Sequence, residues 1–199
     1  LADYLQLRSI ALGMPLENAY LFHGHTGRNF ADTSYWKNHH EILEKAGLEL
    51  VFPTAGVSEI INHKIVENSN YRNLAESCLR SSKAGSVCGR CWKCFRKNTM
   101  KGKSIEIVGE ISTFLEKRPL KQAVSTLYAI QRLPKTQLEE ISIRYPDLDD
   151  LLKDDYSFIE NYLPMSLDLL PTNQRHIIEK RLNEVSMPMN EKQVEMLLN

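Results

Sequence analysis

Four cysteines, the only four in a chain of 199 residues, fall within a segment of 17 residues. They are Cys78, Cys88, Cys91 and Cys94, so that two overlapping Cys-x2-Cys steps follow a gap of nine residues. Thiolates at this spacing can converge on one four-coordinate zinc ion, with each sulfur about 2.3 Å from the metal. A site with four sulfur ligands has no open position, so we expect a structural Zn²⁺ that takes no direct part in chemistry.

The residues around the cysteines leave other interpretations open. Two disulfides or four separate thiols are the alternatives, but Cys-x2-Cys pairs rarely have disulfide geometry outside redox proteins. Residues 77–105 contain eight Lys or Arg and no Asp or Glu. This basic run favours the deprotonated thiols that bind metal. It also leaves nucleic acid open as a partner, with Trp92 either stacking a base or covering the metal loop.

Length and composition predict one domain, or one domain with an appendage. The chain is 42% hydrophobic, which is enough for a core, and its formal net charge is zero. No apolar run approaches the roughly 20 residues that span a bilayer, and no signal peptide is visible. We therefore expect no membrane partner. Clustered thiols with metal spacing fit a reducing compartment, which predicts a cytoplasmic protein.

The first hundred residues alternate between short apolar runs and helical patterns. The runs near 19–23 and 48–52 are typical of buried strands, and a helical pattern at 37–46 lies between them. This order predicts a right-handed βαβ unit in a parallel sheet, with residues 37–46 as the crossover helix. Two further helices are expected at 1–13 and 57–68.

After about residue 100 the pattern becomes helical throughout, with prolines between the segments. The helices that we expect are 105–115, 121–133, 136–143, 148–162, 173–185 and 191–198. The sequence thus predicts an α/β domain at 1–104, with a zinc knuckle at 77–98, followed by an all-helical domain at 105–199.

Three stretches of the α/β part carry a resemblance to a known enzyme family. The first runs from Tyr20 to Tyr35 and contains a Gly-x-Asn-x-x-Asp loop after an apolar run. The second is the apolar run that ends at Pro53, with the loop and helix that follow. The third is the cysteine motif itself, with its Cys-Gly-x-Cys-x-x-Cys core. Together they resemble the 7-cyano-7-deazaguanine synthases, which are PP-loop ATP pyrophosphatases with a Rossmann-like parallel sheet.

The resemblance implies an ATP-dependent, ligase-like activity. A carboxylate of a small-molecule substrate would be adenylated with ATP and Mg²⁺, and an amine nucleophile would then attack the acyl-adenylate. Asn29, Asp32 and Tyr35 match substrate-binding positions, in a loop at 24–36 that would face a loop at 53–58. The family often forms dimers, so the resemblance also implies a homodimer. It assigns no catalytic residue here.

The chain also departs from the family pattern. No Ser-Gly-Gly-x-Asp-Ser loop, which binds the ATP phosphates in the family, occurs in it. Because the chain begins with Leu1, we expect a C-terminal portion of an enzyme whose missing N-terminal half brings in ATP and substrate. Residues 36–40 replace the usual end of the substrate loop, which leaves the substrate open. The alternative is a non-catalytic zinc module that binds nucleic acid or protein, and the βαβ pattern favours the enzyme.

Overall fold

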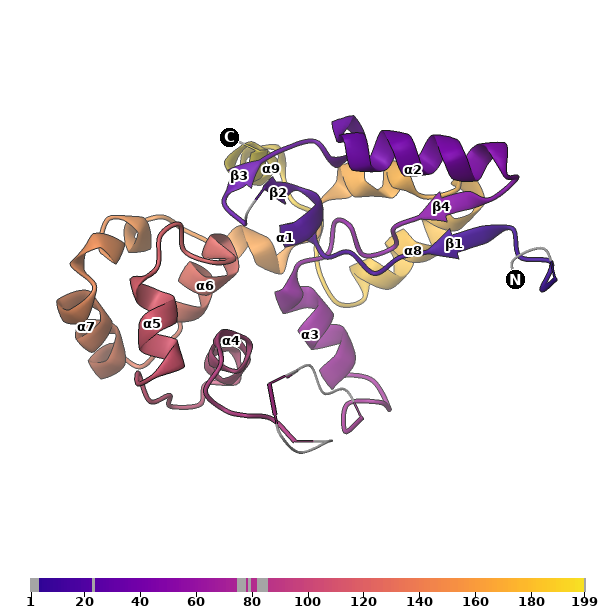
Figure 1. Ribbon diagram of the computed structural model, residues 1–199. Helices are drawn as coiled ribbons and strands as arrows, with labels where there is room; N and C mark the ends of the chain where they lie inside the picture. The colour runs from indigo at the N-terminus through magenta and orange to yellow at the C-terminus, as the bar shows by residue number, and fades with distance from the viewer. Residues whose placement is uncertain (1–3, 23, 75–77, 79, 82–85, 199) are drawn as a thin grey trace. The chain divides into compact units, whose positions relative to one another are not determined.

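The computed structural model describes residues 4–22, 24–74, 78, 80–81 and 86–198 (Figure 1). The chain divides into two compact units. The first unit combines Leu1–Asn62 with Phe158–Asn199, and the second is the continuous segment His63–Ser157. The second unit therefore interrupts the first, and the boundary expected near residue 104 falls inside it.

A small parallel sheet organises the first unit. Strand β1 (Ser9–Ala11) pairs in parallel with β4 (Glu49–Val51), with Ser9 opposite Glu49 and Ala11 opposite Val51. Helix α2 (Ser34–Lys45) precedes β4 and runs along the pair (Figure 1). These elements confirm the α/β class.

Two of the expected elements near the N-terminus are wrong. Residues 9–11 form strand β1 rather than part of a helix, and they take the place beside β4 that was expected for 19–23. The apolar run instead begins with the helical turn α1 (Leu16–Ala19) after Pro15. It ends in β2 (Leu21–Phe22), which pairs antiparallel with β3 (Thr26–Gly27). Proline fixes φ near −65°, a value that suits the start of a helical turn.

The two helices expected around β4 are confirmed, with shifted ends. Helix α2 begins three residues earlier than expected, because the Thr33 hydroxyl accepts a hydrogen bond from the Trp36 N–H at 3.2 Å and caps the helix. Helix α3 (Glu59–Glu67) begins after the buried Ser58, whose hydroxyl accepts from the Ile61 N–H at 3.2 Å. The unit boundary falls within α3.

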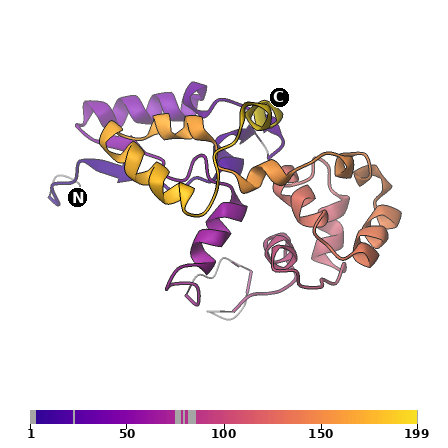
Figure 2. The same cartoon turned by 180° about the vertical axis from the view of Figure 1, so that it is seen from behind.

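The end of the chain completes the core of the first unit. The segment that contains η5 (Pro164–Leu169) covers the loop after β4, and helix α8 (Thr172–Asn183) adds Leu182 to a cluster with Val57, Ile61 and Tyr162. Helix α9 (Glu191–Leu198) lies against β3 (Figures 1 and 2). The helices expected at 173–185 and 191–198 are thus confirmed.

In its described part the second unit is helical. Helix α4 (Trp92–Met100) packs against α5 (Glu110–Glu116) and α6 (Ala123–Ile130), and α7 (Lys135–Arg144) follows. The helices expected at 105–115 and 121–133 are confirmed in shorter form, and the helix expected at 136–143 is confirmed with one more residue at each end.

The single helix expected at 148–162 is wrong. Short 3₁₀ turns replace it: η2 (Pro146–Leu148), η3 (Leu151–Lys153) and η4 (Ser157–Glu160). The Asp155 carboxylate accepts a hydrogen bond from the Ser157 N–H at 2.8 Å, a local bond that competes with continuous helix. Among the described residues, no helix is long and apolar enough to cross a membrane.

Candidate metal centre

The four cysteine sulfurs of the second unit converge on one point. All four Sγ atoms lie within 4.8 Å of one another. Three of the separations are 3.6 Å for Cys91 and Cys94, 3.7 Å for Cys88 and Cys94, and 4.0 Å for Cys78 and Cys91. A tetrahedron of sulfurs about 2.3 Å from a zinc ion has edges of about 3.8 Å, so the cluster has the size that zinc requires.

The same distances exclude the disulfide alternative. Bonded sulfurs lie about 2.05 Å apart, and all four cysteines are free thiols. Soft thiolate ligands in a tetrahedral set suit zinc. The cluster can therefore hold a metal ion in a site that four protein ligands close.

Local structure sets the position of each thiol. Cys91 is the N-cap residue of α4 and Cys94 lies in its first turn, so both are buried against the helix. Gly89 has φ of 73°, a left-handed conformation that turns the chain between Cys88 and Cys91. The Cys88 N–H points back and donates a hydrogen bond to Cys78 Sγ at 3.4 Å.

These contacts shift the pKa values of two of the thiols, Cys78 and Cys94, in opposite directions. Backbone N–H groups of Cys88 and then Arg80 donate to Cys78 Sγ and lower the pKa of Cys78 to about 6. Burial raises the pKa of Cys94 above its ordinary value, and the hydrogen bond with Cys91 adds to this effect. Without a metal ion, Cys78 therefore loses its proton before Cys94 does. A bound cation would favour the thiolate form of all four.

The three expected substrate residues lie together at the start of α2. Asn29 caps the 3₁₀ turn η1 (Phe30–Asp32), with its Oδ1 accepting from the Ala31 N–H at 3.2 Å. The Asp32 carboxylate is exposed and lies 3.8 Å from Lys37 Nζ. Tyr35 is 41% exposed, and its ring lies 4.3 Å from the His39 ring.

Aromatic rings of the 24–36 loop contact Phe52, the residue just before the 53–58 loop. The Phe30 ring meets the Phe52 ring edge-on at 5.1 Å, and the Trp36 ring lies 5.6 Å from that of Phe52. Beyond Phe52, however, Ala55 and Val57 are buried. A substrate pocket between these loops stays a prediction.

A segment more than 100 residues further along the chain covers the second loop. The Leu163 N–H donates to the Gly56 carbonyl at 2.9 Å, and the Ser58 hydroxyl donates to the Ile159 carbonyl at 2.6 Å. Ser166 also packs against Gly56. Sequence reasoning missed these contacts because no local pattern connects residues 56 and 163.

The fold and the cluster define an α/β protein with a candidate four-cysteine metal centre. Residues 38–199 match the model of a family of unknown function, DUF6395, and the chain belongs to that family. The match includes all four cysteines and the whole second unit, whereas Asn29, Asp32 and Tyr35 lie before it. No curated protein and no solved structure matches the chain.

Proposed function

We propose that the protein acts as an ATP-dependent enzyme resembling the 7-cyano-7-deazaguanine synthases, with a structural zinc on Cys78, Cys88, Cys91 and Cys94. The observation that carries the proposal is the convergence of the four sulfurs at the spacing of a tetrahedral site. A parallel strand pair ahead of the cysteines adds support, because a free-standing zinc ribbon needs no parallel sheet.

The reaction would proceed in two steps. A substrate carboxylate attacks the α-phosphate of ATP, which forms an acyl-adenylate and releases pyrophosphate. An amine nucleophile then attacks the acyl carbon, forms the C–N bond and releases AMP. The phosphate-binding loop and its Mg²⁺ would belong to a segment outside residues 1–199.

The residues of this chain would bind and orient the substrate. The exposed Asp32 carboxylate can accept hydrogen bonds from a ligand, and the accessible edge of Tyr35 can line its binding surface. The Asn29 side chain caps the 3₁₀ turn η1, which positions Asp32 and precedes Tyr35. Zinc would fix the cysteine loop and the start of α4 without touching the reacting atoms.

The location and assembly of the protein belong to the same proposal. Four reduced thiols that bind metal fit the reducing cytoplasm, and the resemblance suggests a homodimer.

The test measures ATP–pyrophosphate exchange by the full-length protein with a series of candidate carboxylates. Asp32→Ala should lower kcat/KM at least tenfold, and Lys37→Ala is the matched control because it breaks the same ion pair. Both variants should keep their metal and their stability, since the pair is exposed and such pairs contribute about 0–1 kcal/mol.

Two results would count against the proposal. Full activity of Asp32→Ala would remove the 24–36 loop from the mechanism. If the full-length protein turns over no ATP with any carboxylate, the enzyme is refuted and the alternative of a binding module with a structural zinc is favoured.

A further inference from the structure

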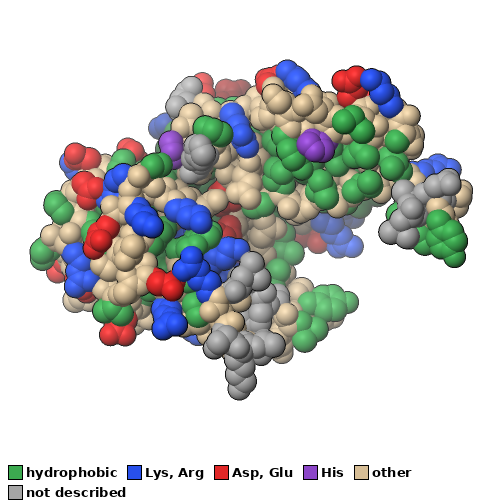
Figure 3. All heavy atoms as spheres, viewed as in Figure 1, with side chains coloured by type: hydrophobic (Ala, Val, Ile, Leu, Met, Phe, Trp, Pro, Cys, Tyr) green, Lys and Arg blue, Asp and Glu red, His purple; other side chains and the backbone are tan. Residues whose placement is uncertain are grey.

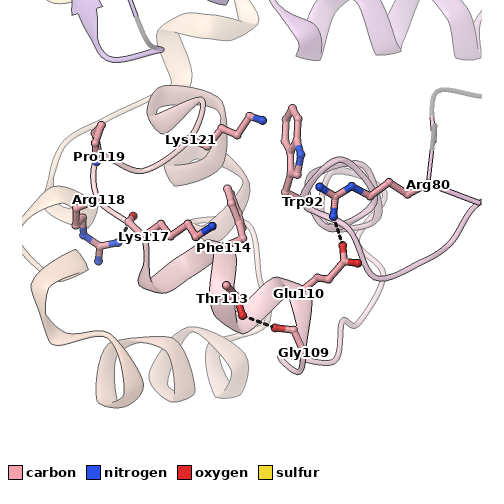
Figure 4. Close-up of a pocket in the computed structure, with 10 residues that line it drawn as sticks. All are labelled: Arg80, Trp92, Gly109, Glu110, Thr113, Phe114, Lys117, Arg118, Pro119 and Lys121. Carbon is pink, nitrogen blue, oxygen red and sulfur yellow. Dashed lines mark hydrogen bonds and ion pairs between the residues drawn. The ribbon is translucent and has the colours of Figure 1, made fainter.

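The second unit has an open pocket of about 660 Å³ beside the start of α4 (Figure 4). Trp92 of α4 lines one side, and Phe114 of α5 with Lys117 and Lys121 of the following segment lines the other. Sites for small molecules typically measure about 300–1,000 Å³ and combine apolar walls with a few placed polar groups. The pocket has this size and this mixture.

Aromatic rings form the apolar part of the pocket. The ring centroids of Trp92 and Phe114 lie 6.4 Å apart with 32° between the planes, and Phe95 packs behind Phe114 at 6.0 Å. Phe95 and Phe114 are buried and hold this surface in place. Rigid aromatic rings at the edge of a basic surface are suited to contact a planar base.

Two lysines supply positive charge to the same space. Figure 4 shows Lys117 and Lys121 extending toward the pocket, and Lys121 Nζ lies 4.5 Å from the centroid of the Trp92 ring. Among the described residues neither lysine forms an ion pair with an acidic group. The other two cations are engaged, because Arg80 pairs with Glu110 at 2.6 Å and Arg118 pairs with Asp147. Lys117 and Lys121 are therefore the cations available to a ligand.

The charge of the whole unit favours an anion. Residues 63–157 contain 17 Lys or Arg against 12 Asp or Glu, although the full chain is neutral. Figure 3 shows Lys and Arg side chains spread over the visible face of this unit. A zinc ion with four thiolates carries two negative charges and offsets part of the excess. Lys117 and Lys121 follow α5 in sequence, and both face the pocket.

We propose that this pocket binds a nucleoside phosphate, with the phosphate between Lys117 and Lys121 and the base against Trp92 and Phe114. A free mononucleotide and one unit of a single-stranded nucleic acid present the same chemistry. The site uses none of the residues assigned to the carboxylate substrate, so it does not rest on the proposed enzyme activity.

The experiment uses Trp92 as the reporter. The chain has two tryptophans, so Trp36→Phe leaves Trp92 alone, and its fluorescence is titrated with AMP, with adenosine and with a 12-nucleotide oligouridylate. We expect saturable quenching by AMP, by the oligonucleotide or by both, and none by adenosine at the same concentration. Quenching by AMP identifies a mononucleotide site, and quenching by the oligonucleotide alone identifies a strand-binding site.

Charge-matched variants test the lysines. Lys117→Ala and Lys121→Ala should each weaken binding about tenfold, because each removes a charge-assisted hydrogen bond to phosphate. Both lysines are exposed, so the fold and the metal content should not change. The control is Lys135→Ala, which removes one exposed charge of the same unit outside the pocket and should change affinity less than twofold.

Three results would overturn the proposal. The first is no quenching by either AMP or the oligonucleotide. The second is equal binding of adenosine and AMP. The third is equal weakening in the pocket variants and in the control, which would show that only the net charge matters.

Discussion

Replacing Gly56 by alanine tests how the end of the chain closes over the loop after β4. A Cβ atom at Gly56 would overlap Ser166 Oγ and would lie 2.6 Å from both the Leu163 carbonyl oxygen and Ser166 Cβ. A rotation of the Ser166 side chain relieves only the first overlap. The backbone around Leu163 must also move, and it would strain the hydrogen bond from the Leu163 N–H to the Gly56 carbonyl.

The expected loss of stability follows from these two effects. Overpacking of a filled site costs about 1–3 kcal/mol. A backbone hydrogen bond contributes about 1 kcal/mol. Gly56→Ala should therefore lower the free energy of unfolding of the first unit by about 2–4 kcal/mol.

Urea denaturation followed by fluorescence measures this change. Trp36 belongs to the first unit and Trp92 to the second, so a Trp92→Phe background makes Trp36 the only reporter. With a slope of about 2 kcal/mol per molar urea, the midpoint should fall by about 1–2 M. Gly13→Ala is the control, because nothing lies within 4 Å of the Cβ position there. Its midpoint should change by no more than about 0.5 M.

A second substitution sharpens the test. Ser166→Gly removes two of the three close contacts, so it should restore part of the stability of Gly56→Ala. Equal midpoints for Gly56→Ala and Gly13→Ala would refute the packing, and so would a double variant that shows only the sum of the single effects.

The remaining predictions concern the cysteines. Elemental analysis should find one zinc per chain. Chelation and Cys91→Ser should each lower the stability of the second unit, because binding of a structural metal is coupled to folding; a chain that keeps full stability without metal would contradict this. In the metal-free protein at pH 7, iodoacetamide should modify Cys78 before Cys94, since the pKa of Cys78 is lowered to about 6 and burial raises that of Cys94. A mass-spectrometric time course that shows the reverse order would exclude the assigned hydrogen bonds. Because the folded state lowers the pKa of Cys78 from 9.0, its thiolate stabilises the metal-free fold fully above pH 9, and this contribution should disappear as the pH falls through about 6. A denaturation midpoint in Cys78→Ser that depends on pH as steeply as in the parent would argue against it.

Some features could be predicted because local patterns determine them. The spacing of the four cysteines over 17 residues predicts the metal cluster, and the turn at Gly89 and the start of α4 position Cys88, Cys91 and Cys94. Helix α2 follows from its apolar periodicity, and its true start follows from the Thr33 cap.

Other features depend on contacts that no local pattern reveals. Strand β1 has three residues, too few to show a period, and it forms because β4 lies beside it. The apolar run at 19–23 has the composition of a buried strand. In the structure it instead contains the end of the helical turn α1 and the two-residue strand β2. Leu163 covers Gly56 from a position more than 100 residues further along the chain, so neither segment alone predicts the contact.

The interruption of the first unit by residues 63–157 has a consequence for synthesis on the ribosome. The chain of the second unit, including all four cysteines, is complete before residues 158–199 have been translated. At about 5–20 residues per second, the last 42 residues take roughly 2–8 s. During that interval Gly56 and Ser58 have no access to Leu163 and Ile159, their later hydrogen-bond partners. The four cysteines are therefore available to a metal ion in the nascent chain before residues 158–199 can complete the first unit.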